Sequence, residues 1–298
     1  MKILIPVDSS AQSRRVLEIL GEHESLVHAK PEIELVNVQY SVPEAIIKLL
    51  NLESVKAYYQ SEGAKVFEAV GAEAFCRRTG AKTKVLYGEA AKAIVAEADA
   101  WQADLIVMGN RGLNPMRGLF LGSVSNGVLS QTRVPMLLLR ENSKPVAGKR
   151  RIGIFVDGSP YGEAAAEYVL SHLELFGPEA EFEVVYAAEP IQEPIAPNPI
   201  GPIAERMTQS ELAAREKADF EEAVRPVVER FKAVGKTIRT VFLTGDASEV
   251  LPEYANANLT HVVMGSHGYG NFTAAVLGST AMHLAADTKL PILVVRRR

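Results

Sequence analysis

The chain has 298 residues, enough for two domains of about 150 residues each. Its composition, 47% hydrophobic and 23% charged, is ordinary for a globular protein, and a net charge of −4 argues against a nucleic-acid-binding surface. The single cysteine, Cys76, excludes an intrachain disulfide, and no apolar run is long enough for a membrane span or a signal peptide, so we expect a cytoplasmic protein without membrane contact.

The first half alternates short apolar strands with helical segments. Strands are expected at residues 3–7, 33–38, 83–87, 105–108 and 135–139, and helices at 13–20, 43–59, 64–78, 90–100 and 123–132. This alternation predicts a doubly wound α/β domain, a five-stranded parallel sheet with helices on both faces. Ligands on such sheets bind beyond the carboxyl ends of the strands, where the strand order reverses. Asp8, Gly88 and Gly109 each follow an expected strand, so we expect them at that edge.

The second half repeats the first. Residues 151–157 (RIGIFVD) match residues 2–8 (KILIPVD), and residues 291–295 match residues 135–139. A repeat of this length indicates two fused domains, which we place at 1–141 and 150–298 with a polar linker at 142–149.

Three further segments carry predictions of their own. The basic clusters 149–151 and 296–298 are interpreted as solvated linker and chain end. The proline-rich residues 189–203 predict a stiff loop, for which covering the second half's site is one hypothesis and an exposed linker the other. Pro226 predicts a kink or a restart in the helical stretch 204–233.

A glycine pattern follows the fourth expected strand of each half: two glycines separated by two residues, then nine residues, then Gly-Ser. The two copies are Gly109, Gly112, Gly122, Ser123 and Gly265, Gly268, Gly278, Ser279. Glycines at a strand end permit positive φ and close approach of a ligand. Gly-Ser at a helix start offers unpaired N–H groups and the positive end of the helix dipole. The pattern predicts phosphate binding; the alternative is a pair of turns that only end strands and start helices.

This pattern resembles the ATP-binding signature of the universal stress protein family, and the resemblance covers nearly the whole chain twice. It implies tandem domains of the adenine-nucleotide α-hydrolase-like fold, paired through their fifth strands at 135–139 and 291–295 within one chain. It also implies ATP as the ligand, with any Mg²⁺ arriving on the phosphates and coordinated by them and by water. A further homodimer and protein partners stay open.

The resemblance assigns more site residues. Asp8 and Asp157 are implied to contact the adenine or the ribose, since a carboxylate accepts hydrogen bonds from both; the alternative is an N-cap of the following helix. A backbone contact to adenine is implied at Val38 and its counterpart Ala187, and a hydroxyl contact to phosphate at Ser125 and Thr280. Ser125 matches the family position better than Thr280.

Three functions are consistent with the sequence. The first is a stress-response protein that binds ATP as a switch or a store. The second is a scaffold that binds no nucleotide, and the third is an enzyme on the same fold, such as a slow ATPase or an adenylyltransferase. The sequence holds no Walker motif, no H-x-G-H near the first strand and no evident base–nucleophile pair, so we predict no catalytic residue and no protein-built metal site.

Overall fold

The structure is a computed structural model that describes residues 1–22, 30–40, 52–110, 122–140, 143, 149–188, 209–266 and 279–296. In the first half the elements are β1 (Lys2–Pro6), α1 (Ala11–Gly21), β2 (Glu32–Gln39), α4 (Leu52–Ala69), α5 (Ala72–Thr79), β3 (Lys82–Tyr87), α6 (Ala90–Trp101), β4 (Leu105–Asn110), α7 (Ser123–Gln131) and β5 (Met136–Arg140). In the second half they are β6 (Arg151–Phe155), α8 (Pro160–Ser171), a 3₁₀ turn (Leu173–Leu175), β7 (Glu181–Ala188), α9 (Gln209–Ala233), β8 (Arg239–Thr244), α10 (Ala247–Asn258), β9 (His261–Gly265), α11 (Ser279–Asp287) and β10 (Ile292–Val295). None of the helices in these ranges is long and apolar enough to cross a membrane.

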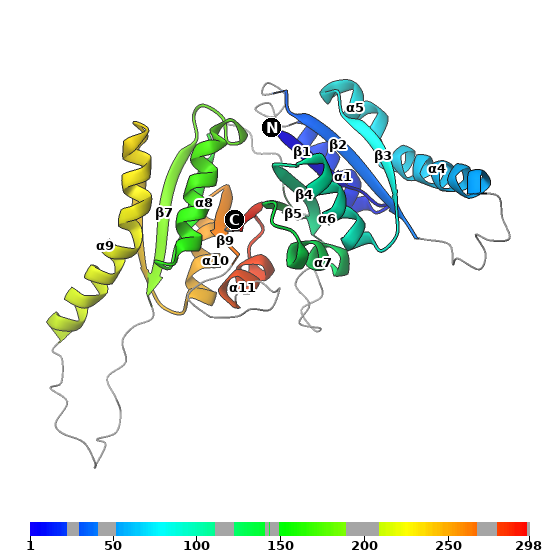
Figure 1. Ribbon diagram of the computed structural model, residues 1–298. Helices are drawn as coiled ribbons and strands as arrows, with labels where there is room; N and C mark the ends of the chain where they lie inside the picture. The colour runs from blue at the N-terminus through cyan, green and yellow to red at the C-terminus, as the bar shows by residue number, and fades with distance from the viewer. Residues whose placement is uncertain are drawn as a thin grey trace, which may run out of the picture.

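The strands of the described ranges form one ten-stranded sheet in the order β3-β2-β1-β4-β5-β10-β9-β6-β7-β8. Neighbouring strands within each half are parallel, whereas β5 and β10 pair antiparallel with Leu138 opposite Ile292. The expected fold, two tandem α/β domains joined through their fifth strands, is confirmed. Figure 1 shows the two halves side by side with this junction between them.

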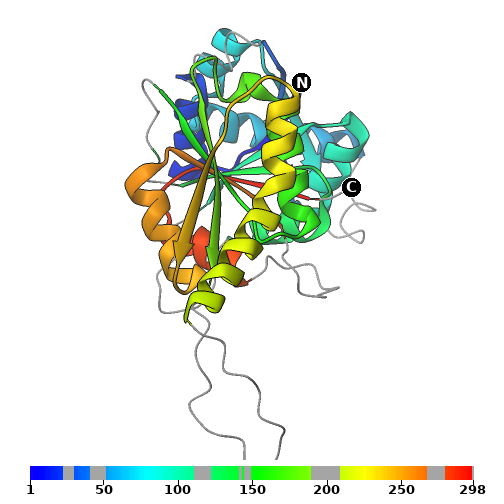
Figure 2. The same cartoon turned by 90° about the vertical axis from the view of Figure 1, so that its left-hand side faces the viewer.

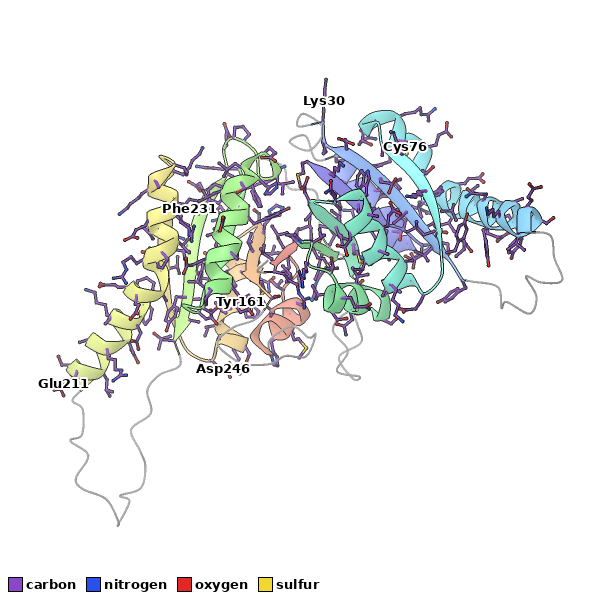
Figure 3. All side chains as sticks on the ribbon, viewed as in Figure 1. Lys30, Cys76, Tyr161, Glu211, Phe231 and Asp246 are labelled. Atoms are coloured by element: carbon purple, nitrogen blue, oxygen red, sulfur yellow. The ribbon has the colours of Figure 1, made fainter. Side chains whose placement is uncertain are left out.

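Helices cover both faces of the sheet because the strands bury side chains on both faces. Ile3 and Ile5 of β1 join the core beneath α1, α5, α8 and α9, while Leu4 joins the core beneath α6, α7, α10 and α11. This two-residue alternation of faces explains why the strands are almost continuously apolar. Figure 2 shows α9 and α10 on opposite sides of the strands. Figure 3 labels Phe231 on α9, where its ring is fully buried and lies 5.3 Å from that of Phe182 on β7.

Two helices test the sequence-based expectations. The predicted break near residues 60–63 is absent, because α4 continues through Gly63 and the chain turns at Gly71, which has φ +73°. A Cβ on Gly63 would lie 2.3 Å from Val85 Cγ2, so this glycine allows close packing of α4 on β3. Of the two alternatives predicted for Pro226, the restart does not occur, because α9 continues through it as one helix; Figure 1 shows that this helix changes direction part-way along, in agreement with a kink. Residues 189–208 lie outside the described ranges.

The interpretation of both basic clusters as solvated was wrong for two arginines. Arg150 is 9% exposed, and its Nη1 donates to the carbonyl oxygen of Phe176 at 3.0 Å. Arg296 is half-buried against the first half. The domain boundaries stay a prediction, since between Arg140 and Lys149 only Ser143 is described.

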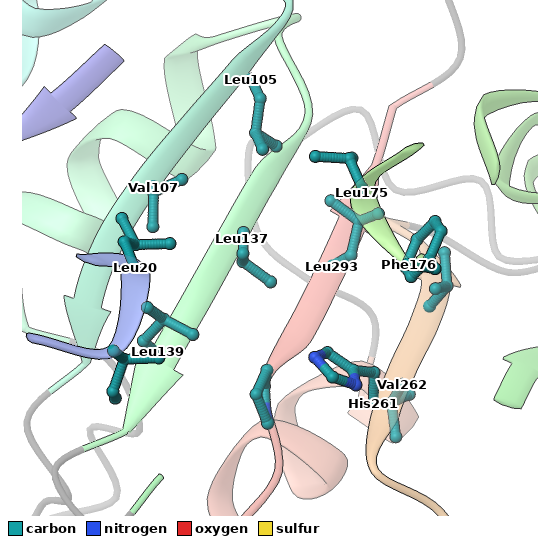
Figure 4. Close-up of a pocket in the computed structure, with 13 residues that line it drawn as sticks. Leu20, Leu105, Val107, Leu137, Leu139, Leu175, Phe176, His261, Val262 and Leu293 are labelled. Atoms are coloured by element: carbon teal, nitrogen blue, oxygen red, sulfur yellow. The ribbon is translucent and has the colours of Figure 1, made fainter. Parts of the chain in front are cut away.

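The junction between the halves is packed with apolar side chains. Figure 4 shows Leu137 of β5 and Leu293 of β10 side by side, flanked by residues of β4 and β9. The cavity left among them is about 40 Å³, room for very few water molecules and well below the roughly 300–1,000 Å³ of ordinary ligand sites. This cavity is a packing feature of the interface.

Candidate functional site

The strand order of each half reverses next to its first strand, and the first half has a pocket at that point. The chain runs outward from β1 to β2 and β3, then returns to place β4 on the other side of β1. A pocket of about 230 Å³ lies there, between the carboxyl ends of β1, β2 and β4 and the first residues of α6 and α7. Its described lining is Pro6, Val7, Asp8, Ser10, Gln12, Ser13, Val36, Asn37, Val38, Ala90, Ile94, Met108, Gly109, Gly122, Ser123, Val124 and Ser125. Six of the predicted site residues of the first half are in this set.

The N-terminus of α7 opens into this pocket. The first intrahelical bond runs from Asn126 N to Gly122 O at 2.9 Å, so the N–H groups of residues 123–125 lie ahead of it. The N-cap is Gly122, with φ −59° and ψ 152°. Among the described residues, only Ser125 Oγ lies within 4.0 Å of a Cβ built on Gly122. This glycine therefore leaves the helix terminus open to the pocket.

The described signature glycines do not use the positive φ that glycine permits. Gly109, Gly122 and Gly265 are absent from the described residues with positive φ. The end of β4 has no room for a side chain, because a Cβ on Gly109 would lie 2.4 Å from Cγ of the buried Gln12. Gln12 Nε2 donates in turn to Leu139 O at 3.1 Å, so Gly109 lets α1 pack against β4 and β5.

Ser125 joins the two parts of the first signature. It is 5% exposed, and its Oγ donates to the carbonyl oxygen of Gly109 at 3.3 Å. The hydroxyl proton is directed to the backbone, while the oxygen retains its capacity to accept. Ser125 thus fixes the start of α7 against the end of β4.

Asp8 is held by two serines of the following turn. Its Oδ1 accepts hydrogen bonds from Ser10 Oγ, from Ser10 N at 3.1 Å and from Ser13 Oγ at 2.7 Å. The N-cap of α1 is Ser10, whose side chain accepts from Ser13 N, so Asp8 is not itself the cap. The carboxylate is exposed at the pocket and fixed in orientation, as a residue that recognises a ligand needs to be.

Asn37 is a pocket residue that sequence reasoning missed. It is 4% exposed, and its Nδ2 donates to Val7 O at 2.8 Å, tying β2 to the end of β1 beside the predicted Val38. Its Oδ1 accepts from Gln39 Nε2 at 2.7 Å. An asparagine within the otherwise apolar run LVNV was the available signal, since a buried amide needs specific partners.

The second half repeats the strand register that builds the pocket. Phe155 of β6 pairs with Val185 and Met264, which brings Asp157, Ala187 and Gly265 to one edge of the sheet. There Asp157 Oδ1 accepts from the N–H of Ser159, the N-cap of α8, at 2.9 Å.

Two features of this second edge differ from the first. The Ser159 hydroxyl is buried and bonds to no described group. Tyr161, labelled in Figure 3, stands where the first half has Gln12, and a Cβ on Gly265 would lie 2.5 Å from Tyr161 Cβ.

Comparison with known proteins identifies this architecture. A sequence model of the universal stress protein family matches residues 1–140 and again residues 149–296. The chain belongs to the universal stress protein family.

Three relatives illustrate the family relationship. A universal stress protein of Mycolicibacterium smegmatis is 28% identical over 304 residues, covering 99% of this chain and 97% of the relative. A universal stress protein of Thermus aquaticus is 33% identical over 141 residues, covering 46% of this chain and 97% of the relative, which is the length of one half. The crystal structure of a universal stress protein from Archaeoglobus fulgidus aligns with a TM-score of 0.67 at 21% identity, over 100% of this chain and 98% of that one. The last likeness supports the fold alone.

Several predicted site residues of this universal stress protein lie outside what the structure describes. These are Gly112, Gly268 and Gly278, together with the side chains of Ser279 and Thr280 at the start of α11. Within the described ranges no group of three or more His, Cys, Asp or Glu side chains is placed to hold a metal ion.

Proposed function

We propose that this universal stress protein binds ATP, or a related adenine nucleotide, at the first-half pocket and at the corresponding edge of the second half. Binding would serve a nucleotide-dependent switch or store in a stress response. The observation that carries the proposal is the open N-terminus of α7, with Gly122 as a bare cap, facing the same pocket as the oriented carboxylate of Asp8.

The lining of the pocket suits the three parts of a nucleotide. Apolar side chains of β1, β2, α6 and β4, among them Val38, Ile94 and Met108, offer surface for a flat base. The carboxylate of Asp8 suits ribose hydroxyls or an amino group, since ionised carboxylates only accept hydrogen bonds. The N–H groups at the start of α7 suit phosphate oxygens, where the helix dipole adds about 0.3–1 kcal/mol per charge.

Phosphate charge would be compensated mainly by several N–H donors acting together. Hydrogen bonds that involve a charged group contribute about 1.5–3 kcal/mol each, more than the dipole term. Mg²⁺ would enter on the phosphates and keep most of its ligands as water and phosphate oxygens. The side chain on the pocket that suits a hard cation is Asp8.

An enzymatic role finds little support in this pocket. Its described lining includes no histidine, cysteine or lysine, and the hydroxyls of Ser10 and Ser13 donate to Asp8 rather than to a base. Because a Cβ on Gly122 would meet no described atom closer than 4.0 Å, this glycine is an open cap in the pocket, and the scaffold alternative is the weaker one.

Nucleotide extraction followed by titration tests the proposal. Protein purified without added nucleotide is denatured, and its extract is analysed for adenine compounds. Nucleotide-free protein is then titrated with ATP, ADP and AMP, with and without Mg²⁺. We expect up to two adenine nucleotides per chain. No binding at millimolar ATP would favour the scaffold, and turnover above about 1 s⁻¹ would favour the enzyme.

A further inference from the structure

Helix α7 has the candidate phosphate site at its N-terminus, and its C-terminus is held by the other half of the chain. Arg296, which follows β10, donates from Nη1 to the carbonyl oxygens of Thr132 at 3.0 Å and Ser130 at 3.4 Å. The last turn of α7 has no basic residue of its own. The cation that hydrogen-bonds the last carbonyl groups of this helix is therefore supplied by the second half.

Arg296 is placed there in spite of the cost of burying a charge. Burial lowers the pKa of its guanidinium, and its Nε is buried without a hydrogen-bond partner among the described residues. A buried charged group is retained where its remaining bonds offset desolvation. Among the described residues, Arg296 donates these hydrogen bonds to the end of α7.

The antiparallel register of β5 and β10 places a second arginine in the equivalent position. Extending the pairing of Leu138 with Ile292 sets Arg140 opposite Leu290, just beyond the end of α11, as it sets Arg296 opposite Val134, just beyond the end of α7. Arg140, which ends β5, has the same place in the first half as Arg296 in the second. Burial lowers the pKa of Arg140, and the nearby carboxylate of Asp287 at the end of α11 partly offsets that shift. Helix α11 also has no basic residue in its last turn. Each fifth strand thus delivers an arginine to the C-terminal end of the other half's last helix.

The first of these helices is fixed at both ends. Ser125 Oγ bonds to Gly109 O near its N-terminus, and Arg296 holds its C-terminus. Nine residues of α-helix connect the two, a length over which a helix moves as a rigid unit. A shift of the C-terminal end therefore changes the position of the N–H groups that face the pocket.

We propose that Arg296 is a positioning residue for nucleotide binding in the first half, and Arg140 for nucleotide binding in the second. The affinity of each half then depends on an arginine supplied by the other, which couples the two sites through the β5–β10 junction. This inference rests on the proposed function.

The test measures each site separately by calorimetric titration with ATP. The Gly278→Val background silences the second half and leaves the first. In it, Arg296→Gln is expected to weaken ATP binding by roughly three- to tenfold, within the range for residues that affect a site without contacting its ligand. Arg296→Lys keeps the charge without the planar guanidinium, so its ATP affinity should lie between that of the Gly278→Val background and that of the Arg296→Gln variant. Arg133→Gln is the matched control, because this exposed arginine follows the same helix and makes the same charge change.

The decisive readout is the site at which affinity falls. In the Gly122→Val background, Arg296→Gln should leave the second site unchanged, whereas Arg140→Gln should weaken it. A general loss of stability would weaken both sites, so equal weakening by either arginine refutes the inference, as does no change at either site. A parent protein that binds no ATP refutes the proposed function and this inference together; a parent that binds ATP with affinities insensitive to both arginines refutes this inference alone.

Discussion

Substituting Gly122 by valine is expected to remove nucleotide binding from the first half while the fold persists. The backbone at Gly122, φ −59° and ψ 152°, is allowed for any L residue, and the nearest atom of the described residues to a new Cβ is Ser125 Oγ at 4.0 Å. Valine is a poorer N-cap than glycine, but it restricts the unfolded chain. These effects oppose each other, so the free energy of unfolding should change by less than about 1 kcal/mol, or about 2–4 °C in Tm.

The loss of binding should be much larger. A phosphate oxygen bonded to the first N–H groups of α7 would lie about 2.9 Å from nitrogen, inside the space that the valine methyl groups take up. Losing two charge-assisted hydrogen bonds costs about 3 kcal/mol or more, which is roughly a hundredfold or more in affinity.

Calorimetric titration with ATP and thermal unfolding together check this reasoning. We expect one fewer ATP per chain and a nearly unchanged Tm, and a smaller loss of affinity in Gly122→Ala. Wild-type affinity in a folded Gly122→Val protein would show that the nucleotide, if bound, does not use the N-terminus of α7.

Three further outcomes are expected. Gly109→Ala should lower the free energy of unfolding by about 1–3 kcal/mol in denaturant titrations, because its Cβ meets buried Gln12 at 2.4 Å; an unchanged midpoint would contradict the packing role. Asp8→Asn should weaken ATP binding by roughly tenfold at similar Tm, since the amide keeps an acceptor for Ser10 and Ser13 but loses the charge; equal affinity would remove Asp8 from the site. Burial, and then the charge of Glu97, raise the pKa of Glu34. The folded chain therefore binds a proton at Glu34 more tightly than the unfolded chain does, and the stability that this contributes is lost as the pH rises through the folded pKa. The free energy of unfolding of Glu34→Gln should therefore rise relative to that of wild type between about pH 4 and pH 7, by no more than about 1 kcal/mol, as measured by urea titrations. A difference between the two proteins that does not change with pH would refute this.

The sequence by itself determined the fold class and which residues of the first half meet at the candidate site. Alternating apolar runs and helical periods predict parallel α/β domains, and the repeat shows that there are two. Asp8, Val38 and Gly109 follow or end strands, and the carboxyl ends of parallel strands meet at one edge, so their proximity is a consequence of topology. The junction was expected from the family resemblance, which implies pairing of the fifth strands, and the structure pairs β5 with β10.

Other features depended on the tertiary structure, because they arise between segments far apart in the chain. Residue 109 must be glycine because Gln12 of α1 packs against the end of β4. The local pattern of a glycine at a strand end does not predict this contact. Helix α4 passes Gly63 because Val85 of β3 fills the space beside it. Arg296 looked like a solvated chain end, yet β5–β10 pairing carries it to the end of α7. Local patterns encode which face is buried and where a strand ends, whereas the partner of a buried charge is decided only when the two halves meet.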